Sequence, residues 1–463
     1  MQVLRSYGWE VVALIPGGGL YGSEWRTLAA SAILNTQAGG GQGQFQLNGG
    51  SNTEHAKTRQ IEEIKALADC HETAAVLTAM IQTDGAGSWP PRANHAYATW
   101  PAALRPYEEV YREIAPLLPQ TTPSFEDVAN RKRITDFRVK SRKLLHDKVN
   151  LPQVKQLLEA VDAGRWDLCP RDVYNAFYCC IASSRHAYRW ATIPVIKVAQ
   201  LEKVVEIPDE LSKPWVYLQN HFGCSSQSGN NTSNLLLNFD VSARHMFKIN
   251  TGMPHLVTSA EEAFARIFYD VESQGVPIYH DMILAIINFA PENKPACAES
   301  MGCITAQLRP LLSSCYDNMH DGRIAQSVWL SRVQGFYAWG AGFYDDTSKE
   351  WVKYDGLSGN QVMLFQALDA FLGIEPYLSS RDQERNVPAQ QRALCRVFEK
   401  YSFRNKLSGT PKEAAEAQIA KEFREIVKRL RVNISKRTPD AGEGVFVSPR
   451  TRKTAYDGRE VAS

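Results

Sequence analysis

The residues that decide the fold lie in three pieces: WLSRVQGFYAW (329–339), YDGLSGNQVMLFQALDAFLGI (354–374) and VPAQQRALC (387–395). The first is an aromatic-rich helical segment that contains Arg332, and the second passes from small residues into a long apolar helix. An arginine can hold a carboxylate through two hydrogen bonds, and aromatic side chains can stack on a flat ring. The pattern therefore indicates a helical site for a planar molecule that has an acid group. A helix–helix salt bridge beside core aromatics explains Arg332 equally well.

Helical periodicity continues on both sides of this stretch. Helices are predicted at 54–83, 103–118, 124–163, 277–290, 297–316, 323–340, 359–373, 388–402 and 411–432. Ser259 and Glu262 have the spacing of a capping box in front of the apolar run AFARIFYDV. Strand patterns are sparse and comprise EVVALIP at 10–16 and an irregular or β-like patch at 245–257. The fold class is therefore predicted to be mainly α.

Composition and periodicity divide the chain into three parts. We expect a smaller, mixed N-terminal region at 1–165, mostly helical with Gly-rich loops, and a large helical domain at 166–434. Periodicity is lost after that domain, so residues 435–463 are expected to form an irregular tail.

The overall charge and the cysteines exclude several function classes. The chain has 463 residues and a formal net charge of +2, which argues against nucleic acid or a membrane surface as a partner. No apolar run is long enough to span a bilayer. The nine cysteines are scattered without a CxxC pair, as is typical of reduced thiols. We therefore expect a cytoplasmic protein.

Two further motifs favour structural roles. Gly17, Gly19 and Gly22 fit GxGxxG, but no βαβ alternation follows them, so a glycine-rich loop is favoured over a dinucleotide site. No HExxH occurs, which leaves zinc unsupported. His280 and Asp281 are adjacent and form a candidate acid/base pair, although a hydrogen-bonded structural histidine is favoured.

Ser358, Gly359, Asn360 and Gln361 lie at the start of an apolar helix and offer hydroxyl, amide and backbone donors. Such a helix start suits an anion, including a porphyrin propionate. A plain helix cap by Ser358 is the alternative.

The order of these segments resembles that of indoleamine 2,3-dioxygenase-type heme proteins from about Ile193 to Leu430. AEEAFARIFYDVE resembles that family's distal-pocket helix. The resemblance puts Phe264 at the substrate-contacting aromatic and Phe268 at a variable position of the same pocket. It matches Arg332 to the arginine that binds the substrate carboxylate.

The resemblance also matches DGLSGNQ (355–361) to the loop that touches heme and substrate, so Ser358, Gly359 and Asn360 are expected to bind cofactor and Ser358 also substrate. It implies heme b, O₂ and a small indole or amino-acid-like substrate derived from tryptophan. The long N-terminal part fits the branch that contains monodechloroaminopyrrolnitrin synthase, so a role in secondary metabolism is expected.

One feature departs from the family pattern. The family holds heme iron through a histidine in its penultimate helix, but no histidine follows His320 here, and Asn433 or Ile434 occupies the approximate position. Asparagine is not a normal axial ligand of heme b. A non-catalytic helical protein that binds ligands or partners is therefore the alternative to a heme-dependent oxidoreductase. The sequence identifies no catalytic residue, no metal ligand and no oligomeric state.

Overall fold

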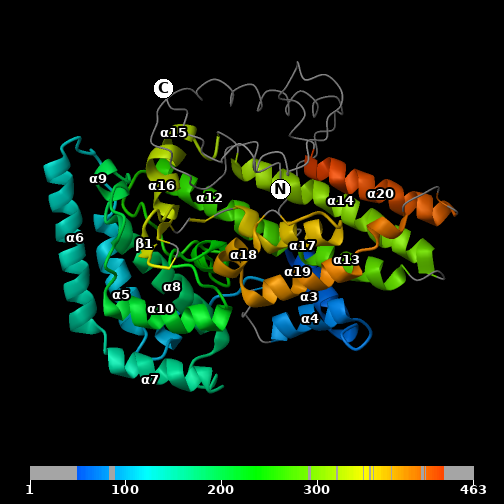
Figure 1. Ribbon diagram of the computed structural model, residues 1–463, viewed down its shortest axis with the longest axis horizontal. Coiled ribbons are helices and arrows are strands. Elements are labelled where there is room, and N and C mark those ends of the chain that lie inside the picture. Colours follow the sequence, from blue (N-terminus) through cyan, green and yellow to red (C-terminus); the bar gives the residue numbers. More distant parts are fainter. Residues whose placement is uncertain are drawn as a thin grey trace, which may run out of the picture.

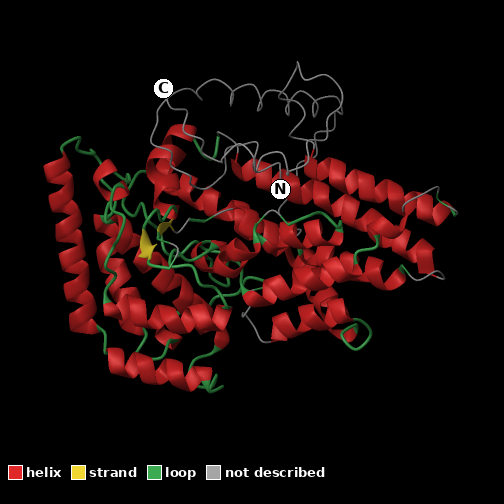
Figure 2. Cartoon of the chain, in the orientation of Figure 1, coloured by secondary structure: helices red, strands yellow, loops and turns green. Residues whose placement is uncertain are grey.

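The computed structural model describes residues 50–82, 89–289, 293–319, 322–347, 349–353, 356–357, 359–376, 378–407, 411 and 413–431. Helices dominate these ranges, as Figures 1 and 2 show, so the prediction of a mainly α fold is confirmed. The strand expected at 10–16, the glycine motif at 17–22, Asn433 and the tail at 435–463 lie outside the described residues. None of the described helices is both long and apolar enough to cross a bilayer.

Helix α8 (Arg171–Trp190) forms the centre of one half of the molecule (Figure 1). Every side chain from Val173 to Trp190 is buried, because α5 (Arg105–Ile114), α10 (Asp209–Phe222) and other helices pack around it. A helix that is covered on all sides cannot show a polar face. Its serines, histidine and arginines therefore have to find partners inside the protein.

The other half is a group of long helices that includes α12 (His255–Gln274), α13 (Val276–Asn288), α14 (Lys294–Met319) and α20 (Ala414–Arg431). Helix α14 packs against the other three. The capping box expected at Ser259 and Glu262 is wrong, because both residues lie inside α12. Pro254 immediately precedes His255, the first residue of α12, so the helix begins before Ser259. Proline lacks the N–H that an interior helix position must donate and is therefore found at a helix start.

Two of the predicted helices are each divided in two. Residues 54–83 become α3 (Gly50–Ala66) and α4 (Glu72–Gln82). At the beginning of α4, the ring of His71 accepts a hydrogen bond from the Thr73 amide at 3.2 Å. Residues 124–163 become α6 (Asp127–Lys148) and α7 (Leu151–Asp162). Helix α3 packs against α13, and α4 packs against α19 (Ala389–Tyr401). The division of the chain at residue 165 remains a prediction.

The segment around Arg332 is built from short pieces rather than from the single helix expected at 323–340. These are α15 (Gln326–Val328), the π-helix η5 (Trp329–Val333) and α16 (Gln334–Tyr337). An antiparallel hairpin of β1 (Gly342–Asp345) and β2 (Glu350–Lys353) follows. This hairpin was not predicted from the sequence.

The remaining elements connect these helices. They are η1 (Tyr97–Thr99), η2 (Ala115–Leu117), α9 (Lys197–Gln200), α11 (Asn231–Asn234), η3 (Leu236–Asn238), η6 (Gly359–Gln361), α17 (Met363–Phe371), α18 (Ser380–Asn386) and η7 (Arg404–Leu407). Residues 245–257, expected to be β-like or irregular, contain one isolated bridge, between Phe239 and His245. Residues 246–254 otherwise form turns and bends, and residues 255–257 are the first residues of α12.

Candidate functional site

Arg332 lies in the π-helical turn η5, where the Gln334 amide donates to the Trp329 carbonyl five residues earlier. Such turns are rare and often occur at functional sites. The Arg332 Nη1 donates to the backbone oxygens of Gln120 at 2.5 Å and Ile193 at 3.4 Å. These two bonds fix the direction of the guanidinium. They also join η5 to two segments that are distant in the sequence.

The charge of Arg332 has no carboxylate partner among the ion pairs of the described residues. The salt bridge offered as its alternative role is therefore not found in this part of the chain. Burial lowers the pKa of Arg332, yet arginine stays protonated in proteins. A partly buried guanidinium without a counter-charge favours a bound anion.

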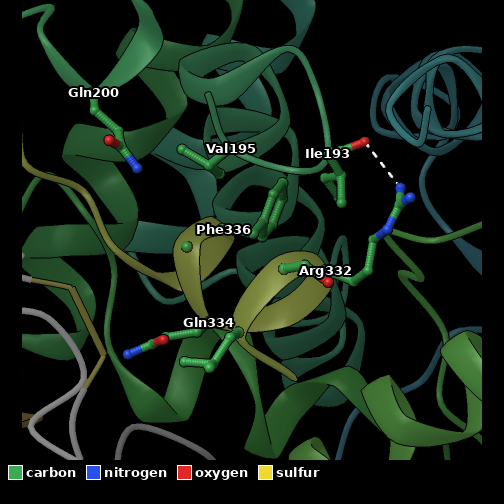
Figure 3. A pocket seen from close by; sticks show the side chains of 9 residues that line it. Ile193, Val195, Gln200, Arg332, Gln334 and Phe336 are labelled. Atoms are coloured by element: carbon green, nitrogen blue, oxygen red, sulfur yellow. Dashed lines mark hydrogen bonds between the residues drawn. The ribbon is translucent and has the colours of Figure 1, made fainter. Parts of the chain in front are cut away.

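A small groove lies beside Arg332 (Figure 3). Its lining combines hydrogen-bond donors with apolar side chains and contains no acidic residue: Ile193, Val195, Gln200, Leu330, Ser331, Arg332, Gln334, Gly335 and Phe336. Its volume is about 70 Å³. This space holds a few water molecules and is therefore enough for a carboxylate group.

The structure puts Phe264 and Phe268 in the core instead of the groove. Both belong to α12 and are 1% and 3% exposed. The ring centroid of Phe264 lies 5.3 Å from that of Phe268 and 5.3 Å from that of Tyr337. Phe264 therefore contacts Tyr337, which follows the groove residue Phe336 in α16, and helix α12 also packs against η5. A direct contact of either phenylalanine with substrate remains a prediction.

The loop that contains Gly359 packs against α16. A Cβ on Gly356 would lie 2.2 Å from the Tyr337 carbonyl oxygen, so only glycine fits there. Gly359 is buried at the start of η6. Ser358 and the side chain of Asn360 lie outside the described residues. The structure therefore brings the backbone of this loop close to the helix that follows Arg332.

Gln361 is the last residue of this loop. Its Oε1 accepts a hydrogen bond from the Asn231 amide at 2.9 Å, and its side chain is buried. Asn231 belongs to a polar segment, 230–234, whose residues are all buried. A buried polar backbone needs side-chain partners, and Gln361 supplies one of them.

His186 connects α8 to α16, the short helix that follows Arg332, through a hydrogen bond. Its Nδ1 lies 2.8 Å from the Phe336 carbonyl oxygen and its Nε2 lies 2.6 Å from that of Ser228. Burial lowers the pKa of His186 to about 4, so the ring is neutral at pH 7. A neutral imidazole has one N–H and donates to only one of the two carbonyls. His186 therefore supports the fold beside the groove and is not free to bind a metal.

A heme needs an axial ligand and a cavity that holds a porphyrin. The four buried histidines of the described ranges, at 95, 186, 245 and 280, all make hydrogen bonds or ion pairs, and none lines the groove. His280 is bound by Glu63 at 2.9 Å and Asp281 at 3.1 Å, which supports its structural role. Ligand pockets measure roughly 300–1,000 Å³. The groove beside Arg332 is smaller than this range and none of the four buried histidines lines it, so this groove does not fit a heme.

A protein-family profile described as indoleamine 2,3-dioxygenase matches residues 166–426. This range is more than half of the 463-residue chain and extends from just before α8 into α20. It contains Phe264, Arg332 and Gly359. A comparison with curated proteins gave no match.

Proposed function

Because the chain belongs to the indoleamine 2,3-dioxygenase family, we propose that it is a heme-dioxygenase-like oxidoreductase that acts on a planar indole with a carboxylate, together with O₂. The family is heme-dependent and acts on small molecules. Family membership supports the class of reaction. The observation that supports the substrate class is that Arg332 lines a groove without acidic residues and its guanidinium has no carboxylate partner among the described residues.

The geometry of Arg332 suits a carboxylate. The hydrogen bonds that anchor it to Gln120 and Ile193 both come from Nη1. The edge formed by Nε and Nη2 can therefore present two parallel N–H groups to a carboxylate. The side-chain donors of Ser331 and Gln334 border the same groove. An amino-acid-like substrate would be oriented by its acid group, with its ring held by apolar side chains.

Ser358, Gly359, Asn360, Phe264 and Phe268 are the other residues that we propose to contact substrate or cofactor. We further propose that the enzyme belongs to the branch that contains monodechloroaminopyrrolnitrin synthase and works in secondary metabolism in the cytoplasm. The support is the resemblance in the order of segments and the long part of the chain before residue 166. Mass spectrometry of the products formed from L-tryptophan and from substituted indoles tests this assignment.

A second candidate is a non-catalytic protein that binds the same class of ligand. It is favoured by one observation, namely that none of the four buried histidines of the described ranges lines the Arg332 groove, which is smaller than a porphyrin. Both candidates use the Arg332 groove. They differ in whether heme is required.

Titration of the full chain with hemin, followed by reduction and CO, separates the two candidates. An oxidoreductase gives a saturable absorption band that shifts with CO, and it consumes L-tryptophan only when heme and O₂ are present. A binding protein gives no saturable band but still binds L-tryptophan. The absence of both heme binding and L-tryptophan binding contradicts the proposed function in either form.

A further inference from the structure

Asn250 connects the pocket helix α12 with the turn that bears Arg332. Its Nδ2 donates one hydrogen bond to Glu261 Oε2 at 2.9 Å and another to the Arg332 carbonyl oxygen at 3.1 Å. Asn250 and Glu261 are both fully buried. Glu261 lies one helical turn before Phe264 on α12. One amide group therefore bridges the two segments to which the substrate residues were assigned.

The orientation of this amide is fixed by its surroundings. Glu261 Oε1 accepts the Ile249 amide at 2.8 Å, and Oε2 accepts the Asn250 amide at 2.9 Å. If the Asn250 side chain were flipped, its oxygen would face the carboxylate and the Arg332 carbonyl, which are both acceptors. The Asn250 Oδ1 has no hydrogen-bond partner in the structure. A buried acceptor left in this way is unfavourable, so the two donor bonds have to offset that cost.

Hydrogen bonds also fix the orientations of Asn238 and His245, which lie on the other side of Glu261. Asn238 accepts the Phe247 amide at 2.7 Å and donates to the Phe247 carbonyl at 3.2 Å, so its Nδ2 is a donor toward His245 Nε2 at 3.0 Å. The proton of the neutral His245 ring is therefore on Nδ1, which faces Glu261 Oε1 at 4.0 Å. Three groups donate hydrogen bonds to the Glu261 carboxylate, namely the Ile249 and Asn250 backbone amides and the Asn250 side chain.

We propose that Asn250 and Glu261 are positioning residues that hold the π-helical turn so that the Arg332 guanidinium faces the substrate carboxylate. This inference rests on the proposed ligand site and deepens it. The Glu261 carboxylate fixes the Asn250 amide, and the amide holds the carbonyl of the residue whose side chain binds the acid. Neither residue lines the groove, so neither has to touch the ligand.

The test compares L-tryptophan with tryptamine, which has the same ring and amine but no carboxylate. Calorimetric titration of the full chain should give a preference for L-tryptophan that depends on Arg332. Asn250→Ala should reduce this preference about tenfold, the equivalent of one lost hydrogen bond. Tryptamine affinity should change little. A variant that was only less stable would lose affinity for both ligands equally.

Hydrogen–deuterium exchange of residues 329–337 tests the turn without any ligand. Exchange there should rise in Asn250→Ala and, to a smaller extent, in Glu261→Gln, which keeps one acceptor oxygen. The exposed Asn220→Ala on α10 is the matched control and should change neither measurement.

The outcomes separate the two proposals. If the wild-type chain does not prefer L-tryptophan, the proposed ligand site is wrong. If the wild-type chain has the preference and both variants retain it with unchanged exchange at 329–337, the positioning role is wrong. If Asn250→Ala does not fold, the same two measurements on Glu261→Gln decide whether the positioning role is correct.

Discussion

The Nη1 of Arg332 lies 3.4 Å from the carbonyl oxygen of Ile193, to which it donates a hydrogen bond. Ile193 also accepts the Gln120 amide at 2.7 Å, so this carbonyl is shared between a backbone contact and the guanidinium. The side chain proposed to bind substrate is thus anchored by the backbone of another segment. An anchored guanidinium loses less conformational entropy on binding a carboxylate.

Gly356 should not tolerate a larger side chain. In Gly356→Ala the new Cβ would lie 2.2 Å from the Tyr337 oxygen and 2.7 Å from the Ala338 Cα, and both are backbone atoms that cannot move aside easily. We expect a loss of about 1–3 kcal/mol in the free energy of unfolding, measured with urea. Gly302→Ala is the control, because a Cβ there meets nothing within 4 Å. It should be neutral or stabilising, and an equal loss in both variants would contradict the close packing of Gly356.

The pH dependence of stability should reveal Glu261. Burial raises the pKa of Glu261 from 4.5 to about 7 in the folded chain. The folded protein therefore holds this proton more tightly, and the resulting stability is complete below pH 4.5 and is lost as pH rises through about 7. The difference between the two pKa values corresponds to roughly 3 kcal/mol.

Glu261→Gln removes this titration. The free energy of unfolding of the variant, relative to wild type, should rise by up to about 3 kcal/mol as pH increases from 4.5 to 7. Urea unfolding at several pH values measures it. The exposed Glu299→Gln variant is the control. A difference that does not vary with pH would show that Glu261 is ionised in the folded protein throughout this range.

Asn433→His tests the position at which the family resemblance expects the axial histidine. If the protein is a heme-dependent oxidoreductase and residue 433 occupies the position of the axial iron ligand, the variant should bind hemin more tightly than wild type. Absorption titration with CO measures the change. An unchanged titration would exclude residue 433 as the position of an iron ligand.

Periodicity and proline positions were enough to predict the long helices. The helix predicted at 411–432 is found as α20, close to the expected bounds. The hairpin after α16 was missed because its four-residue strands are too short to show alternation. The π-helical turn at Arg332 was missed because one residue of altered hydrogen bonding leaves no pattern in composition.

The candidate site was predicted less completely than the helices. Arg332 was singled out because aromatic residues surround it in the sequence, and its role in binding a carboxylate remains a prediction. Asn250 and Glu261 were not found, since a polar residue that will be buried looks like an exposed one in a sequence. Their partners come from three separate segments, and only the folded chain brings these together.

The central claim is that Arg332 binds the carboxylate of a planar ligand, and calorimetric titration of the full chain with L-tryptophan tests it most directly. Wild type should bind, Arg332→Lys should lose about tenfold in affinity because the two-pronged contact becomes a single charge, and Arg332→Ala should lose more. Arg309→Ala, an exposed arginine on α14, should bind as wild type does. Equal L-tryptophan affinity in wild type and Arg332→Ala, or no binding by wild type, would contradict the account.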